Sequence, residues 1–220
     1  MTSGWSARVL NAFGASAAQY DASAELQQTM ARQLARRCRH SAIPEGLWVD
    51  LGSGTGCLAD ALEQQHPGQA VLRVDGSDAM LRSQSGAGAT LLHDLNEGLP
   101  TWSSAPTLLC SSFVLHWLHD PPERLRHWFD QLAPGGWLAL TVPVDGSFEQ
   151  WHQAAERAGV PCTALPFPRM ELLLSAVPEQ AVRWKRKQRF SSTGRHPLEL
   201  LQPMIRTGAD TTPVAGIGPS

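Results

Sequence analysis

A short apolar run near residue 50 leads directly into three closely spaced glycines. The residues are Val49-Asp50-Leu51-Gly52-Ser53-Gly54-Thr55-Gly56. Because glycine has no Cβ, the backbone of such a turn can approach a ligand where any other residue would collide. The amides that open the following helix then face a polar group of that ligand. In a doubly wound sheet this turn lies at the carboxyl end of the first strand, so the motif predicts an α/β fold with a small-molecule site.

Short apolar runs continue to alternate with helical segments after this turn. The predicted strands are 47–51, 70–74, 90–93, 107–112 and 137–142, and the predicted helices between them are 57–65, 78–83 and 122–132. Strands separated by helices form parallel sheets that helices cover. The sequence therefore predicts a Rossmann-like, doubly wound α/β fold, with a mainly parallel sheet and helices on both faces.

Helix-forming residues dominate the first forty positions, most clearly over 22–39. Apolar side chains recur there at every fourth position and predict one buried helix face, at Leu26, Met30 and Leu34. A proline and a glycine then end the helical region. We expect residues 1–45 to form an N-terminal helical lid and residues 46–220 to form the ligand-binding domain.

Beyond residue 142 the alternation of strands and helices loosens. The predicted helices are 148–158, 168–176 and 197–205, the predicted strand is 182–190, and the last fifteen residues are predicted to be a frayed tail. Residues 183–189 carry five basic side chains. We interpret this run as an exposed edge strand protected by charge, in preference to an anion-binding patch.

Two classes of ligand compete for the glycine-rich turn. A dinucleotide site requires G-x-G-x-x-G, which leaves room for a pyrophosphate, whereas this chain has G-x-G-x-G. Asp50, two residues before the first glycine, would repel a pyrophosphate but attract the ammonium group of a methionine moiety. A P-loop is excluded because no Gly-Lys-Ser/Thr sequence follows the glycines.

Acidic residues close the next two predicted strands. Asp75 follows the second strand about twenty residues after the glycines, where a carboxylate accepts hydrogen bonds from both hydroxyls of a ribose. Asp94 closes the third strand, where an acid beside a backbone amide can bind the exocyclic amine of adenine. Either acid alone is equally well explained as a solvated turn residue. Together with Asp50 they place three acceptors along one crevice, which favours a cofactor that contains adenosine.

The composition excludes several other functions. A chain of 220 residues with 42% hydrophobic and 17% charged residues fits one α/β domain. Its formal net charge of −2 lacks the basic excess of a nucleic-acid-binding protein. The spacing of the four cysteines is not that of metal ligands, and it predicts neither a metal site nor disulfides. They are Cys38, Cys57, Cys110 and Cys162. With no signal peptide and no apolar segment of membrane-spanning length, we expect a soluble cytoplasmic protein without a membrane partner.

With these residues the chain resembles the class I S-adenosylmethionine-dependent methyltransferases. The resemblance covers residues 47–142 and rests on 50–56, on Val74-Asp75-Gly76-Ser77 with Met80, on His93-Asp94-Leu95 and on 132–138. It implies S-adenosylmethionine as the cofactor, with the glycine-rich turn at its methionine end, Asp75 at its ribose and Asp94-Leu95 at its adenine. The cofactor-binding residues that it implies are Asp50, Gly52, Ser53, Gly54, Gly56, Asp75, Gly76, Met80, Asp94, Leu95 and Ser111.

Further segments resemble the malonyl-acyl-carrier-protein O-methyltransferases of biotin biosynthesis. They are residues 11–21 with 25–27, residues 111–117 and residues 145–152. This resemblance implies methyl-ester formation on the free carboxylate of a malonyl thioester, with malonyl-acyl-carrier protein as the substrate. Because a carboxylate is already nucleophilic at neutral pH, in-line placement and exclusion of water would supply most of the catalysis.

The same resemblance implies two catalytic candidates. Tyr20 is expected in the lid over the active centre, where it hydrogen-bonds the carboxylate or packs on the cofactor; a role in anchoring the helix to the sheet fits equally well. His116 follows the fourth predicted strand, where substrate-contacting groups lie, and Trp117 is expected in the core or at the rim. Arg169 and Arg206 are candidates for binding the malonyl carboxylate.

One departure from that family keeps alternatives open. Its members end in an antiparallel strand rich in β-branched and aromatic residues, and this sequence has no counterpart of it. We therefore expect a sheet without its usual last strand, with an exposed edge or a partner there. The alternatives are a methyltransferase for another small acid, thiol or hydroxyl, and a non-catalytic S-adenosylmethionine-binding module. The glycine spacing disfavours a nicotinamide enzyme.

Overall fold

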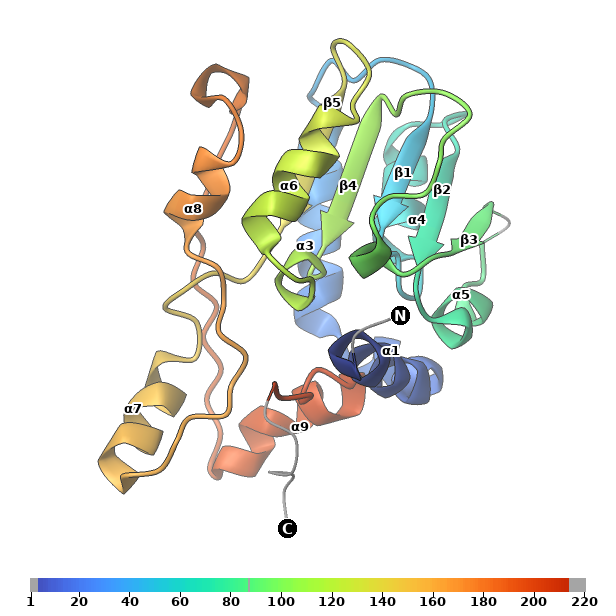
Figure 1. Cartoon of the computed structure of the whole chain (residues 1–220). Helices are drawn as coiled ribbons and strands as arrows, with labels where there is room; N and C mark the ends of the chain where they lie inside the picture. The colour runs from blue at the N-terminus through green and yellow to red at the C-terminus, as the bar shows by residue number, and fades with distance from the viewer. Residues whose placement is uncertain (1–3, 87, 214–220) are drawn as a thin grey trace.

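The computed structural model describes residues 4–86 and 88–213, and its centre is a five-stranded parallel sheet (Figure 1). The strands are β1 Trp48–Leu51, β2 Val71–Asp75, β3 Thr90–Leu92, β4 Leu108–Ser112 and β5 Trp137–Thr141. They lie in the order β3-β2-β1-β4-β5, and every neighbouring pair is parallel. The order reverses between β1 and β4, so the carboxyl ends of these two strands form the topological switch point. The predicted fold class is confirmed.

Alternate residues of the central strands pack into two separate cores. Trp48 and Cys110 face one core, where the helices α3 (Glu25–Cys38) and α4 (Cys57–Gln65) cover the sheet. Val49 and Leu109 face the other core, which α6 (Pro121–Asp130) and α8 (Met170–Ser175) cover. Figure 1 shows α3 and α6 on opposite sides of the sheet. Burial on both faces explains why these strands read as nearly continuous apolar runs.

The packing of α3 differs from the predicted one. Leu26 is 38% exposed and Met30 is only half-buried, so the predicted stripe at every fourth residue is wrong at its first two positions. The buried face carries mostly small side chains, at Ala31, Leu34, Ala35 and Cys38. Small residues let α3 approach α4 closely, and this close approach turns the larger side chains of its first turns away from the core.

The N-terminal helices lie across the carboxyl ends of the strands. They are α1 (Gly4–Ser16), the short helix η1 (Ala17–Gln19) and α2 (Tyr20–Ser23). Both α1 and η1 contact α5 (Asp78–Ser83), which follows β2. Figure 1 shows the arrowheads of β2 and β4 pointing toward α1. These helices therefore cover the edge at which the sequence places the ligand site.

The segment after β5 contains helices at the predicted places but lacks the predicted strand. The helices are α7 (Glu149–Ala158), α8, η4 (Glu179–Ala181) and α9 (Pro197–Thr207). Residues 182–190 pair with no strand, and every side chain from 183 to 190 is exposed. The predicted strand at 182–190 is wrong, because Arg186 and Gln188 interrupt the face that Val182, Trp184 and Phe190 would present to a sheet.

The predicted frayed tail begins too early. Thr207 ends α9 with only 1% exposure, and a Cβ on Gly208 would lie 2.5 Å from the carbonyl oxygen of Ala12 in α1. The end of α9 is therefore packed on the N-terminal helices. Residues 214–220, the remainder of the predicted tail, lie outside the described residues. At the other side of the molecule, β5 is the last strand of the sheet and pairs with β4 alone among the residues that the structure describes.

Candidate cofactor and acceptor site

The glycine-rich turn folds back onto β2. The amides of Gly52 and Ser53 both donate to the carbonyl oxygen of Val74, at 2.7 and 2.9 Å. Gly52 has φ +73°, and a Cβ on it would lie 2.3 Å from Cγ2 of Val114. Position 52 therefore accepts no residue other than glycine without rearrangement. Two side-chain bonds hold the turn further, because Nε2 of Gln84 donates to the carbonyl oxygen of Gly54 at 2.8 Å and to Oγ of Ser53 at 3.1 Å.

A narrow cavity of about 50 Å³ lies between this turn, Tyr20 of α2 and the first turns of α3. The cavity is lined by Tyr20, Gln27, Gln28, Ala31, Asp50, Gly52, Ser53, Gly54, Thr55, Cys57, Leu58 and Ser112. Its volume is a small fraction of that of a nucleoside cofactor, because one water molecule already occupies roughly 30 Å³ of liquid. We therefore expect cofactor binding to move the N-terminal helices away from the turn.

Asp50 lies at the bottom of this cavity. Its side chain is 1% exposed, and its Oδ2 accepts a hydrogen bond of 3.1 Å from the amide of Ala59 in α4. Burial raises the pKa of Asp50 to about 7, against the lowering effect of that amide. A ligand ammonium beside the carboxylate would favour its ionised form.

We expect the affinity for S-adenosylhomocysteine to rise with pH up to about pH 7. Below the raised pKa of Asp50 the carboxyl must release a proton to pair with the ligand ammonium. Affinity should therefore fall by up to about tenfold for each pH unit below 7. Titration calorimetry from pH 5.5 to 8 in buffers of different ionisation enthalpy measures this effect and the released proton. Asp50→Asn should bind more weakly and without this pH dependence; a wild-type affinity that is flat over this range would contradict the assignment.

Asp75 joins the end of β2 to the glycine-rich turn. Oδ2 accepts from the amide of Gly54 at 2.8 Å, and Oδ1 accepts from the amide of Ser77 at 2.8 Å. Burial raises the pKa of Asp75, and the backbone amides around it oppose that effect. Each carboxylate oxygen keeps a second lone pair, so the same group can brace the turn and accept from ribose hydroxyls. Met80 is buried beside this turn, at 2% exposure.

Asp94 is already in contact with α1. Its Oδ2 accepts from Oγ of Ser6 at 2.6 Å, and its Oδ1 accepts from the amide of Asn96 at 2.9 Å. Leu95 is buried beneath it. The first turn of α1 therefore covers the carboxylate that the sequence assigns to adenine, and this contact must open if adenine is to reach Oδ2.

An aromatic cluster lies at the carboxyl end of β4. It contains Trp5, Phe13, Tyr20, Phe113, His116, Trp117, Phe148 and Phe167, and each ring has another of these rings within 6.3 Å. Trp5 stacks on Trp117 at 6.1 Å and donates through Nε1 to its carbonyl oxygen at 3.1 Å. Phe113 has φ +60° and Phe148 has φ +55°, which are uncommon for bulky residues. Trp117 is 8% exposed, as expected for a core position.

The two catalytic candidates lie in this cluster and both are neutral. His116 is 6% exposed, its Nδ1 has no hydrogen-bond partner among the described residues, and burial lowers its pKa to about 3. Burial raises the pKa of Tyr20, with the charge of Asp75 adding to the effect. Next to Tyr20, Asp21 accepts a hydrogen bond of 2.7 Å from Oγ1 of Thr55, which ties α2 to the glycine-rich turn.

His116 should make the protein sensitive to acid. The folded chain holds the imidazole neutral down to about pH 3, whereas the unfolded chain protonates it near pH 6.5. Stability from this group is therefore complete above pH 6.5 and is lost as the pH falls, by about 1.4 kcal/mol per pH unit. Between pH 7 and 5, wild type should lose about 2 kcal/mol more than His116→Gln in urea unfolding. His152→Gln, which removes an exposed histidine, should behave as wild type. Equal losses in all three proteins would show that His116 is protonated in the folded state.

The remaining sequence candidates lie elsewhere. Arg169 is exposed and lies 4.0 Å from Glu171, and Arg206 bonds to Gln202 on α9, so neither lines the cavity. Oγ of Ser111 donates to the carbonyl oxygen of Leu51 at 2.7 Å and joins β4 to β1. The sequence analysis missed Gln28, Gln84 and Ser112. Gln28 follows directly on the 25–27 motif and Ser112 lies within the 111–117 motif, which were the available signals; Gln84 becomes part of the site only through the fold.

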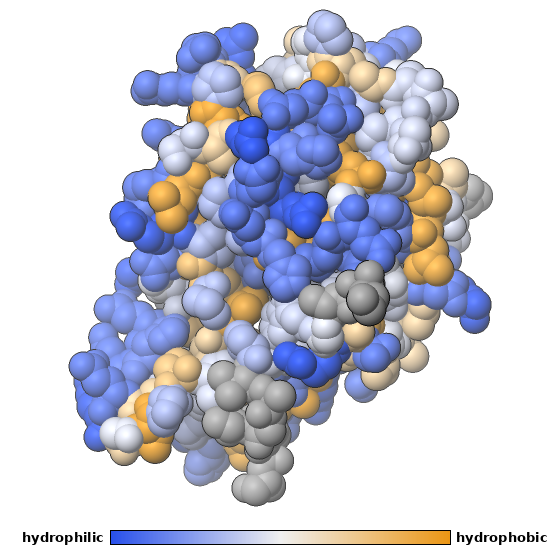
Figure 2. Space-filling view, in the orientation of Figure 1, coloured by the Kyte–Doolittle hydropathy of each residue, from blue (hydrophilic) through white to orange (hydrophobic). Residues whose placement is uncertain are grey.

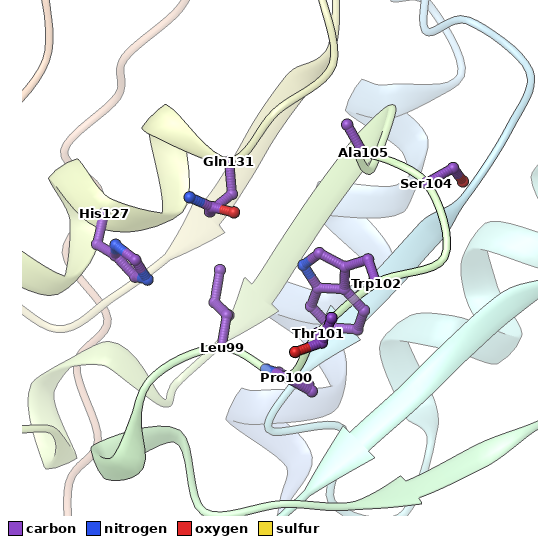
Figure 3. Close-up of a pocket in the computed structure, with 8 residues that line it drawn as sticks. All are labelled: Leu99, Pro100, Thr101, Trp102, Ser104, Ala105, His127 and Gln131. Atoms are coloured by element: carbon purple, nitrogen blue, oxygen red, sulfur yellow. The ribbon is translucent and has the colours of Figure 1, made fainter.

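A larger hollow lies on the face of the sheet that α6 covers (Figure 3). It measures about 410 Å³ and is formed by residues 99–105, which lead into β4, together with His127 and Gln131 near the end of α6. None of the sequence-predicted site residues lines it. The described residues contain no group of three side chains that could hold a metal ion, and no described helix is long and apolar enough to cross a membrane.

The parallel sheet, the glycine-rich turn at its switch point and the acid that ends β2 define a class I S-adenosylmethionine-dependent methyltransferase. A family model described as a methyltransferase domain matches residues 21–167, and the chain belongs to that family. Its cofactor is S-adenosylmethionine. The residues fit this cofactor, because the turn holds glycines where side chains would collide and Asp50 and Asp75 lie on either side of it.

Curated relatives fall into two groups. The chain is 35% identical over 113 residues to trans-aconitate 2-methyltransferase of Mycobacterium tuberculosis, which covers 50% of this chain and 41% of the relative. It is 39% identical over 121 residues to the Deinococcus radiodurans enzyme of the same name, covering 52% and 46%. It is 34% identical over 151 residues to malonyl-[acyl-carrier protein] O-methyltransferase of Alcanivorax borkumensis, covering 66% and 51%. The matches span about half the length of these relatives.

Solved structures share the fold. The complex of DhpI with SAM and HEP has a TM-score of 0.58 at 19% identity and covers 80% of this chain and 88% of that one. A possible histamine N-methyltransferase from Thermotoga maritima has a TM-score of 0.55 at 20% identity, covering 76% and 80%. These structures support the fold, and they do not identify the methyl acceptor of this chain.

Proposed function

We propose that this protein transfers the methyl group of S-adenosylmethionine to a carboxylate oxygen, and that the acceptor is the free carboxylate of a malonyl thioester on an acyl carrier protein. The observation that carries the proposal is the absence of an available base among the described residues of the aromatic cluster. His116 is a very weak base because its pKa lies near 3, and Tyr20 stays a neutral phenol. A hydroxyl acceptor would need a base to remove its proton, whereas a carboxylate is already ionised.

The reaction needs no proton transfer. A carboxylate oxygen attacks the sulfonium methyl group, the new C–O bond forms as the C–S bond breaks, and the bonding electrons stay on sulfur. The products are a methyl ester and S-adenosylhomocysteine. The residues of this chain would therefore orient the two reactants in line and keep water from the reacting atoms.

Two neutral groups can orient the acceptor. The hydroxyl of Tyr20 lies at the cavity and can donate to the carboxylate oxygen that does not react. Nδ1 of His116, which has no partner among the residues that the structure describes, can bond to the acceptor once the cluster opens, which would satisfy a buried polar atom that is otherwise costly. Arg169 and Arg206 remain candidates for binding the acceptor carboxylate. Neither lines the cavity, so their positions do not support this role.

Two alternatives remain distinct from this proposal. A free small polycarboxylic acid is the second acceptor candidate, because the trans-aconitate 2-methyltransferases are similar to this chain. A non-catalytic S-adenosylmethionine-binding module is the other alternative, and methyl transfer to any acid excludes it. We also propose that residues 1–45 act as the lid, since α1 and α2 already contact Asp94 and the glycine-rich turn.

Transfer of labelled methyl groups tests the proposal directly. The acceptors are malonyl-acyl-carrier protein, malonyl-coenzyme A, trans-aconitate, and a hydroxyl and a thiol compound of similar size. We expect esters with the malonyl thioesters and no product with the hydroxyl compound. Tyr20→Phe should lower kcat by about tenfold or more, because one transition-state hydrogen bond is lost, and should leave the affinity for S-adenosylhomocysteine unchanged. Preferred methylation of the thiol or hydroxyl would refute the carboxylate assignment.

A further inference from the structure

Nearly all of the side chains in one long surface segment are exposed, and the segment is strongly basic. Residues 180–198 contain six lysines and arginines and no acidic residue, although the whole chain has a formal charge of −2. The rest of the molecule is therefore net acidic. Every cation of this segment is exposed, at Arg183, Lys185, Arg186, Lys187, Arg189 and Arg195. None of them takes part in an ion pair with a described residue. We call residues 183–195 the basic strap.

The strap begins beside further cations on α3. The guanidinium of Arg37 lies over the ring of Trp184 at 5.3 Å. Further exposed arginines on α3 and directly after it extend the basic surface from this contact, at Arg32, Arg36 and Arg39. Half of the lysines and arginines of the chain thus lie in two adjoining segments, residues 32–39 and 183–189. Such a concentration creates a local positive field that attracts a partner of opposite charge.

Aromatic side chains and free backbone groups accompany the charge. Trp184 is 50% exposed and Phe190 is 44% exposed, and large exposed rings of this kind anchor protein interfaces. Among the described residues, the backbone amides of 183–194 make no hydrogen bonds, so they can pair with another chain. Figure 2 shows hydrophilic surface over α7 and α8 on the left of the molecule, interrupted by separate apolar patches.

The strap also leads to the ligand site. It runs from the Trp184 contact on α3 to α9, and α9 packs on α1, α2 and η1. These are the helices that cover the cofactor turn and the aromatic cluster. A partner on the strap would therefore lie beside the helices that must move for the site to open.

We propose that the basic strap, with the arginines of α3, is the docking surface for an acidic protein, namely the carrier that presents the acceptor carboxylate. The identity of the partner rests on the proposed function, whereas the surface itself rests on charge and exposure. A small acidic protein can contact the basic strap without also contacting the acidic remainder of the molecule. A nucleic acid or an anionic membrane is favoured less, because a long polyanion or a flat anionic surface would also face the acidic remainder of the molecule.

Charge-neutral variants test the surface. The strap variant combines Lys185→Gln, Arg186→Gln and Lys187→Gln, and the matched control combines Arg82→Gln, Arg126→Gln and Arg157→Gln, three exposed cations elsewhere. Binding of unmodified acyl carrier protein is measured by titration calorimetry at two salt concentrations. We expect the strap variant to bind about tenfold or more weakly than wild type and to lose most of the salt dependence, whereas the control stays near wild type.

Steady-state kinetics provide the second measurement. The KM for malonyl-acyl-carrier protein should rise about tenfold in the strap variant, while the KM for malonyl-coenzyme A and the affinity for S-adenosylhomocysteine stay unchanged. If the chain methylates no acid, the proposed function fails, and the binding comparison still decides the docking surface. Equal losses in strap and control variants, an unchanged strap variant, or tighter binding of RNA or anionic vesicles than of the carrier protein would each overturn the proposal.

Discussion

Asp75→Ala should abolish measurable binding of S-adenosylhomocysteine, with a rise in Kd of about 100-fold or more. If the carboxylate accepts from both ribose hydroxyls, as we propose, each charge-assisted hydrogen bond contributes about 1.5–3 kcal/mol. Losing two such bonds costs about 3 kcal/mol or more, which corresponds to roughly two powers of ten in Kd. The variant also leaves the amides of Gly54 and Ser77 without their acceptor, so the glycine-rich turn loses a brace.

Two further variants separate cofactor recognition from structure. Asp75→Asn keeps the shape and one acceptor oxygen, so it should fold and still bind at least tenfold more weakly than wild type. Asp78→Asn changes an exposed acid three residues later and should bind as wild type. Titration calorimetry gives the affinities, and thermal unfolding without ligand shows whether each protein is folded. A folded Asp75→Ala protein with wild-type affinity would show that the cofactor does not use this carboxylate.

The strands and the glycine-rich turn could be predicted because their signals are local. Each strand contains a short apolar run, and burial on both faces keeps apolar residues at successive positions, as in Trp48-Val49 of β1 and Leu108-Leu109-Cys110 of β4. The glycine at position 52 was likewise part of a short recognisable motif. The structure explains why it is needed, because its φ is positive and a Cβ would collide with Val114. Asp75 could be placed at the end of the second strand, but its assignment to the site depended on the glycine-rich turn and on the acids at the other strand ends. Its bond to the amide of Gly54 confirms that the two segments meet.

Other features depend on contacts between distant residues, which no local pattern contains. Ser6 donates to Asp94 across 88 residues of chain, so no local pattern connects α1 with the end of the third strand. The aromatic cluster similarly assembles rings from five separate segments. The segment 182–190 has the alternation of a strand, but Arg186 and Gln188 interrupt its apolar positions, and the structure leaves it outside the sheet. Pattern alone could not decide that outcome.

A buried arginine in β2 is the feature that the sequence concealed most completely. Arg73 is 0% exposed, although it occupies a central position of a strand that reads as apolar. Its Nη2 lies 2.6 Å from Oδ1 of Asp60 and 2.8 Å from Oε2 of Glu63, both on α4. The guanidinium fills the space beneath the following loop, because a Cβ on Gly88 would lie 1.2 Å from Nη1. This network fixes α4, and with it the amides that follow the glycine-rich turn, against β2.

Removing both acids should therefore destabilise the protein far more than removing the arginine. In Asp60→Ala/Glu63→Ala the guanidinium keeps its charge in a buried site without a partner, which costs about 3–5 kcal/mol. In Arg73→Met an apolar side chain fills much of the same space. The two acids are 39% and 30% exposed and can be hydrated, so this change should cost less than about 2 kcal/mol.

Urea unfolding of the two variants and of wild type measures this asymmetry. The control Glu123→Ala removes an acid from an exposed pair with Arg126 and should leave the free energy of unfolding close to that of wild type. If Arg73→Met proves as unstable as the double variant, the arginine itself would be the indispensable packing element. With the predicted asymmetry, the acids of α4 act mainly to neutralise a charge that β2 buries. The strand β2, which ends at Asp75, would then depend on α4 for its stability. The same helix supplies the amides that follow the glycine-rich turn.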